Sequence, residues 1–158
     1  METLPLRPAK GQDVEAIVRL VNVAFLAERP FIKGDRINAE GVQEMLARGR
    51  FLLAEQDGVL AACVFVNPQG ERAHLGLVSV DPALQGKGLG SRLMAAVEVY
   101  CRATGYREME LRFINHRTDL ARFYQKMGYA ETGVTEQLPD QTRVKVPFHF
   151  VQMCKRLG

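Results

Sequence analysis

The sequence contains no tryptophan, few cysteines and no long apolar segment. Its longest uninterrupted apolar run is Val59–Val66, far short of the roughly 20 residues that span a bilayer. The three cysteines are odd in number, lie far apart and show neither a CxxC pair nor the spacing of zinc ligands. These absences exclude a membrane span, a disulfide scaffold and a zinc module. They predict that Cys63, Cys101 and Cys154 pack as small apolar side chains in a reduced protein.

A tract of one charge is also absent. The net charge is +3, from 21 Lys and Arg against 18 Asp and Glu. The excess lies in residues 80–158, which hold 12 basic and 8 acidic residues, whereas residues 1–79 hold 9 and 10. Because this excess is modest and dispersed, no nucleic-acid surface is implied, and a small anionic ligand near the second half fits better. Residues 1–8 lack the basic head and apolar middle of a signal peptide, which favours a cytoplasmic protein.

Length and composition predict one globular domain. The chain has 158 residues, of which 47% are hydrophobic and 25% charged, and it shows no repeat, low-complexity segment or linker. Strand-like and helix-like segments alternate in the order β-α-α-β-β-β-α-β-α-β-β. This order predicts an α/β fold, in which a mixed sheet lies in a three-layer domain that covers residues 1–158.

Turn signals set the limits of the central elements. Asp57-Gly58 predicts a tight hairpin, residues 67–70 (NPQG) predict a second turn, and Leu4–Pro8 is expected to form a short edge strand. A long helix is expected to carry Leu89, Leu93 and Val97 on one face and to end at Gly105. The hydrophobic segment 148–151 favours an internal strand, with a homodimer through this segment as the alternative.

A glycine-rich loop follows a buried strand at residues 78–80. Gly86, Gly88 and Gly90 alternate along it, so several backbone amides can point to one centre at the start of a helix. Such a loop binds phosphate groups, and Lys87 adds a positive charge. The spacing fits neither the Walker pattern nor the dinucleotide pattern G-x-G-x-x-G, which would need glycine at Ser91. A turn that only caps the helix is the alternative.

Two motifs resemble those of the GNAT superfamily of acyl-CoA-dependent N-acetyltransferases. Residues 85–90 (QGKGLG) match its Q/R-x-x-G-x-G/A signature, and residues 77–82 (LVSVDP) are similar to the strand that enters that loop. Further along, Asn115 and residues 123–129 (FYQKMGY) resemble the family's N…YxKxG[FY] element. The resemblance spans nearly the whole chain, and it implies a GNAT-like mixed sheet of about seven strands with four helices.

The resemblance also implies acetyl-CoA as the co-substrate, with no metal. Backbone amides of residues 85–91 would bind its pyrophosphate. The main chain of Val78 and Val80 would pair with the pantetheine arm, and the Val78 amide would face the thioester carbonyl. Asn115 would bind the cofactor where two strands splay apart, although its spacing to Tyr124 is longer than in the family by about two residues. The implied cofactor-binding residues are Val78, Val80, Gln85, Gly86, Lys87, Gly88, Leu89, Gly90, Ser91 and Asn115.

Tyr124 is the catalytic residue that the resemblance implies, as the general acid that protonates the leaving thiolate. The alternative is a core residue, because Tyr124 lies on one helical stripe with Leu120 and Met127. The general base stays open. Glu110, His74 and His149 are candidates, and water alone could carry the amine proton.

The acceptor pocket is expected from residues 28–38, the second helix and residues 137–147, whose charges are mixed in sign. These charges do not identify the acceptor. We therefore predict an N-acetyltransferase that moves an acetyl group from acetyl-CoA directly to a primary amine of a small molecule. The alternatives are a peptide or protein amine as acceptor, and a non-catalytic acyl-CoA-binding module.

Overall fold

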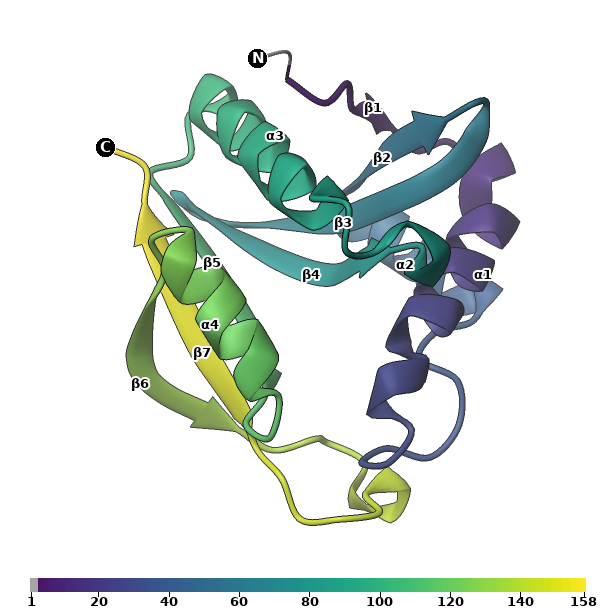
Figure 1. Ribbon diagram of the computed structural model, residues 1–158, viewed down its shortest axis with the longest axis vertical. Helices are drawn as coiled ribbons and strands as arrows, with labels where there is room; N and C mark the ends of the chain where they lie inside the picture. Colours follow the sequence, from purple (N-terminus) through teal and green to yellow (C-terminus); the bar gives the residue numbers. More distant parts are fainter. Residues whose placement is uncertain (1–2) are drawn as a thin grey trace.

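The computed structural model describes residues 3–158, which form one mixed seven-stranded sheet and four α-helices (Figure 1). The strands follow the spatial order β1-β2-β3-β4-β5-β7-β6. They are β1 (Arg7–Pro8), β2 (Arg50–Gln56), β3 (Val59–Gln69), β4 (Arg72–Val80), β5 (Glu108–Ile114), β6 (Ala130–Glu136) and β7 (Phe150–Arg156). The helices are α1 (Val14–Ala24), α2 (Ala39–Arg48), α3 (Leu89–Thr104) and α4 (Thr118–Lys126). The predicted element order and three-layer α/β fold are confirmed.

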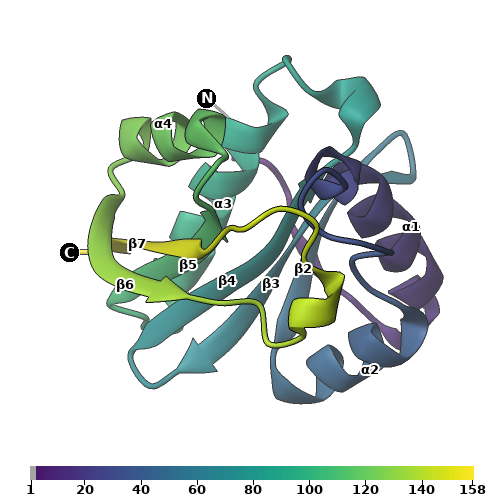
Figure 2. The ribbon, with the colours of Figure 1, turned by 90° about the horizontal axis from the view of Figure 1, so that it is seen from below.

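Two hydrophobic cores lie on opposite faces of the sheet. Helices α1 and α2 cover one face of the strands β2–β4, and α3 and α4 lie on the other side (Figure 2). The first core contains Ile17 and Val21 of α1 with Phe51 of β2, all fully buried. The second contains Leu93 and Val97 of α3 with residues of β3, β4 and β5. The amphipathic stripes of the helices therefore account for the layering.

Several predicted limits need correction. Strand β1 is confined to Arg7–Pro8, shorter than the predicted Leu4–Pro8. The second turn does not occupy residues 67–70, because β3 continues through Pro68 to Gln69 and only Gly70 and Glu71 make the turn. Gly70 has φ +65, so two residues are enough to reverse the chain. Strand β7 is internal, between β5 and β6, as favoured for the C-terminal segment.

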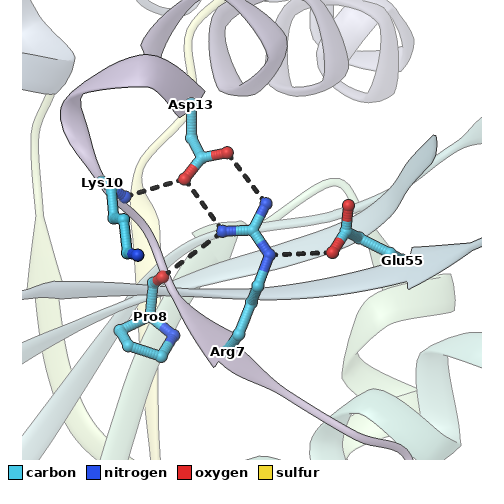
Figure 3. A network of polar contacts seen from close by, with 5 residues as sticks. All are labelled: Arg7, Pro8, Lys10, Asp13 and Glu55. Carbon is cyan, nitrogen blue, oxygen red and sulfur yellow. Dashed lines mark hydrogen bonds and ion pairs between the residues drawn. The ribbon is translucent and has the colours of Figure 1, made fainter. Parts of the chain in front are cut away.

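An ion-pair network fixes the short strand β1 to its surroundings (Figure 3). Two nitrogens of the Arg7 guanidinium donate to the two carboxylate oxygens of Asp13 at 2.9 Å, and the third donates to Glu55 on β2 at 2.8 Å. Asp13 also accepts from the backbone N–H of Lys10 at 2.8 Å. The hydrogen bonds from Arg7 hold the pKa of Asp13 below its usual value. This network joins β1, the start of α1 and β2.

The cysteine prediction holds for two of the three thiols. Cys63 and Cys101 are buried, and Cys154 is half-buried. Burial raises the pKa of both Cys63 and Cys101 to about 12, so these two thiols are neutral. Between residues 3 and 158, no helix combines the length and apolarity that a membrane crossing requires. The same residues bring together no group of His, Cys, Asp and Glu suited to a metal ion.

A bulge in β4 changes which side chains face which core. Val64 of β3 stands opposite both Leu77 and Val78, since Cys63 pairs with Ser79 and Phe65 with Gly76. Leu77 has φ +49 there, an uncommon conformation for a branched side chain. Leu75 packs in the α3 core, whereas Leu77 packs in the α1 core. Val78 and Val80 consequently turn toward α3 and α4.

Candidate functional site

One cavity of about 760 Å³ passes between β4 and β5. These parallel strands pair only from Arg72 with Glu108 to His74 with Glu110, and beyond that point they carry no ladder contacts. The cavity is lined by Val78, Val80 and Tyr124 from the α3 and α4 side. His74, on the opposite side of the sheet, lines it too. The gap between the strands therefore connects the two faces, and its size is typical of a small-molecule site.

The glycine loop lies at one end of this cavity. Gly86 and Gly88 have φ +81 and +78, a region that glycine adopts easily, and Gly88 is the N-cap of α3. Of the predicted amides of residues 85–91, that of Gln85 is not free, because it donates to the Pro82 carbonyl at 3.3 Å. Within the described part of the chain, no backbone N–H of residues 86–91 donates a hydrogen bond. A Cβ placed on Gly86 or Gly88 would meet nothing within 4 Å. Free amides, open space and a helix N-terminus are the features by which protein loops bind phosphate groups.

Most of the residues implied as cofactor contacts line this cavity. The structure brings together Val78, Val80, Gln85, Gly86, Gly88, Gly90 and Ser91. The side chains of Lys87 and Leu89 do not line it. Lys87 is exposed, and Leu89 is buried in the α3 core, so only their backbone amides belong to the loop.

Asn115 lies away from the cavity. Its side-chain oxygen accepts the backbone N–H of His149 at 3.0 Å, and its own N–H donates to the His149 carbonyl at 2.9 Å. These two bonds extend the pairing of β5 with β7, so the side chain of Asn115 is engaged by the backbone of His149. Arg117, two residues later, lines the cavity and forms two hydrogen bonds of 3.1 Å to Asp119. The spacing from Asn115 to Tyr124 is longer than in the family by about two residues, and it is Arg117, two residues after Asn115, that lines the cavity.

Tyr124 is packed among aromatic rings and also borders the cavity. Its ring centroid lies 5.9 Å from that of Phe113, 5.1 Å from Phe123 and 5.6 Å from Tyr129. Burial raises its pKa to about 12, so the phenol carries its proton at neutral pH. Its hydroxyl donates to no residue among those described, and the residue lines the cavity.

A carboxylate–histidine pair borders the cavity where the strands separate. Nδ1 of His74 lies 2.9 Å from one carboxylate oxygen of Glu110, and Arg72 donates to the other at 2.8 Å. Burial alone would raise the pKa of Glu110, but the bonds from Arg72 and His74 outweigh it and lower this pKa. Glu110 is therefore an anion that orients His74, whereas His149 lies away at the smaller cavity with Asn115.

The end of the cavity opposite the glycine loop is lined from residues 24–37 and α2. Phe25, Glu28 and Arg36 contribute from the first segment, and Met45 and Arg48 from α2. The carboxylate of Glu28 is buried, 3.7 Å from Arg117. Its burial raises its pKa, against the lowering effect of Arg36 and Arg117.

The predicted contribution of residues 137–147 needs correction. This segment does not line the large cavity. Val144 forms a β-bridge with Ile32, and Arg143 donates to the carbonyl of Asp35 at 2.8 Å. The segment therefore contacts the loop of residues 28–38 without lining the cavity.

The sequence pattern of the Acetyltransferase (GNAT) family matches residues 15–129, the greater part of the chain. This chain belongs to the GNAT family. Among curated relatives, the amino-acid acetyltransferase of Azotobacter vinelandii is 28% identical over 138 residues, which cover 85% of this chain and 29% of that protein. Glucosamine 6-phosphate N-acetyltransferase 1 of rice (Oryza sativa subsp. japonica) is 34% identical over 93 residues, or 59% of this chain and 53% of that protein. The matches thus span about half of these relatives or less.

Solved structures agree on the GNAT fold. The ribosomal-protein-S18-alanine N-acetyltransferase of Escherichia coli superposes with a TM-score of 0.77 over 98% of this chain and 94% of that one, at 16% identity. At this identity the likeness concerns the fold alone. The shared fold includes the mixed seven-stranded sheet in which β4 and β5 separate.

The sequence analysis included Glu28 in the expected acceptor pocket only as one of several mixed charges, and it did not predict Arg117 at the cavity. A signal for Glu28 existed, because it continues the buried helical stripe of Ile17, Val21 and Phe25 by one further step of three. A glutamate on a buried stripe is unusual and indicates a functional position. Arg117 had no such signal, since its place depends on where β5 ends.

Proposed function

We propose that this chain transfers an acetyl group from acetyl-CoA to a primary amine of a small molecule, directly and without a covalent enzyme intermediate. The observation that carries this proposal is that one cavity of about 760 Å³ passes between β4 and β5. This cavity is lined by the glycine loop with its free backbone amides, by the protonated Tyr124 and by charged side chains of residues 24–37.

Acetyl-CoA would supply the activated acetyl thioester. The amides of residues 86–91 would hold its pyrophosphate, and the unpaired edge of β4 at Val78 and Val80 would hold its pantetheine arm. The bulge at Leu77 supports a further role for the Val78 amide, as the donor to the thioester carbonyl. One such donor to a developing oxyanion contributes about 3–4 kcal/mol to catalysis in other acyl transfers.

Proton transfers would use two groups on the cavity wall. His74, oriented by Glu110, would accept a proton from the acceptor amine so that its nitrogen can form the new C–N bond. Tyr124 would give its proton to the thiolate as the C–S bond breaks. Tyr124 then regains a proton from solvent, and His74 releases one, so charges balance over a turnover.

The acceptor end supports a small molecule. Glu28 is buried and Arg36 is half-buried at the cavity wall. The segment 137–147 packs against the loop of residues 28–38 through the Ile32–Val144 bridge. The relatives from Azotobacter and rice are named for an amino acid and an amino sugar phosphate, both small amines.

The proposal is tested by thiol release from acetyl-CoA with amino acids, polyamines, aminoglycosides and peptides as acceptors. We expect release with at least one small amine, together with its acetylated product. Binding of acetyl-CoA without release across the whole panel would contradict the catalytic assignment. Faster release with peptides than with any small amine would contradict the acceptor class.

A further inference from the structure

The guanidinium of Arg36 reaches the cavity without a protein partner. Its Nε is buried and unpaired, and no nitrogen of this side chain donates a hydrogen bond to a residue between 3 and 158. No carboxylate of those residues lies within 4.0 Å of it. An enclosed donor without an acceptor is costly, so such a group in a cavity indicates a ligand.

The position of Arg36 is fixed from the backbone. Its N–H and that of Ile37 donate to the side-chain oxygen of Asn22 on α1 at 2.9 and 3.0 Å, and the Asn22 amide donates back to the Ile37 carbonyl at 2.9 Å. The guanidinium lies over the Phe25 ring, with its central carbon 5.4 Å from the ring centroid. The side chain is thus held in place before any ligand binds.

The other arginines around the cavity differ from Arg36. Arg112 forms an ion pair with Glu136 and stacks over Phe150, and Arg117 forms its two bonds to Asp119. Arg48 is exposed to solvent. Burial lowers the pKa of Arg36, and the charges of Arg112 and Arg143 lower it further, with only Glu28 opposing them. An added anion would relieve this unfavourable balance of charge.

We infer that Arg36 binds a carboxylate of the acceptor, so that the substrate is a small primary amine that also carries an acidic group, such as an amino acid. This inference rests on the proposed function, because it concerns the acceptor end of the same cavity. The planar fork of arginine matches a carboxylate through two parallel hydrogen bonds. Bound in this way, the acceptor would extend its amine along the cavity toward His74 and Tyr124, which line the same space.

The test compares each amino acid with its carboxamide, which keeps the amine and side chain but lacks the charge. For the wild type we expect kcat/KM to be about 10- to 100-fold higher for the acid than for its amide. Arg36→Gln should remove this preference by lowering kcat/KM for the acid while leaving kcat/KM for the amide and the KM for acetyl-CoA unchanged. Arg36→Lys should restore part of the preference. The matched control is Arg29→Gln, an exposed arginine of the same loop that does not line the cavity.

The possible outcomes separate the two proposals. Turnover of amines with equal kcat/KM for acid and amide, or an equal loss for both in Arg36→Gln, would overturn the carboxylate site and leave the acetyltransferase proposal standing. A preference for 2-aminoethylphosphonate over β-alanine would also overturn it. If no amine is acetylated, calorimetric titration of amino acids into the complex of the protein with coenzyme A tests the site directly. Binding to the wild type that is lost in Arg36→Gln supports the carboxylate site. Absence of binding to the wild type overturns it. A thermal unfolding curve for each variant shows that it is folded.

Discussion

Glu110 and His74 form a 2.9 Å pair at the point where β4 and β5 stop pairing. The carboxylate is buried and the imidazole is half-buried, so solvent screens the interaction between Glu110 and the His74 ring only weakly. If His74 accepts the amine proton, this orientation matters for turnover and not for binding of the co-substrate. Glu110 is then a positioning residue.

Glu110→Gln should lower kcat about tenfold, and His74→Gln about a hundredfold, because a positioned general base contributes at least this much. The KM for acetyl-CoA should not change in either variant, since neither residue belongs to the glycine loop. Steady-state thiol release measures both quantities. Unchanged kcat in His74→Gln would assign proton removal to water.

The same pair makes stability depend on pH. The pKa of Glu110 is lower in the folded protein than the value of about 4.3 expected when unfolded. Its ionisation therefore stabilises the fold above that value, and the contribution is lost as the pH falls through the folded pKa. Urea unfolding should show Glu110→Gln less stable than the wild type by about 1–3 kcal/mol at neutral pH. A gap that stays constant into the acid range would contradict this linkage.

Tyr124→Phe should lower kcat about a hundredfold, because it removes a general acid from the cavity. The aromatic packing with Phe113, Phe123 and Tyr129 persists, so the free energy of unfolding should change by less than about 1 kcal/mol. Tyr129→Phe is the matched control, since this tyrosine is equally buried but does not line the cavity. A loss of less than about threefold in Tyr124→Phe would defeat the assignment.

The protonation state of Tyr124 gives a second readout. Because its pKa is raised to about 12, the acid form persists through the mildly alkaline range and is lost only as the pH rises through that value. At every pH up to about 10, deprotonation of Tyr124 should therefore cause no decrease in the kcat of the wild type. A decline near pH 9 that disappears in Tyr124→Phe would contradict the burial of the phenol.

The sequence sufficed to predict the layers of the fold and the position of the glycine loop, but not the surroundings of Asn115 and Arg36. Periodicity and turn residues determine local structure, and they located α3 and its Gly105 cap correctly. The position of Asn115 depends on how far β5 pairs with β7, and this long-range register leaves no local trace. The placement of Arg36 likewise depends on Asn22 and Phe25, residues 14 and 11 positions earlier, which only tertiary folding brings to it.

Gly88→Ala should weaken acetyl-CoA binding. Alanine at φ +78 is strained, and its methyl group would enter the open space beside the free amides. Gly70→Ala is the matched control, because Gly70 has φ +65, equally open surroundings and a position outside the cavity. Both variants should lose about 1–2 kcal/mol of unfolding free energy. Only Gly88→Ala should raise KM for acetyl-CoA, by about tenfold. Equal KM values in the two variants would contradict binding of the pyrophosphate by this loop.

Asp13→Asn should destabilise the fold without changing catalysis. Asp13 is buried and accepts two bonds from Arg7 and one from Lys10, and an amide cannot accept all three (Figure 3). We expect a loss of about 1–3 kcal/mol, because a hydrogen-bonded charge of a buried group is removed. Glu55→Gln, which removes the exposed arm of the same network, should cost less than about 1 kcal/mol. Neither residue lines the cavity, so kcat and KM should match the wild type in both variants. Equal losses of stability would mean that the network acts only as surface charge.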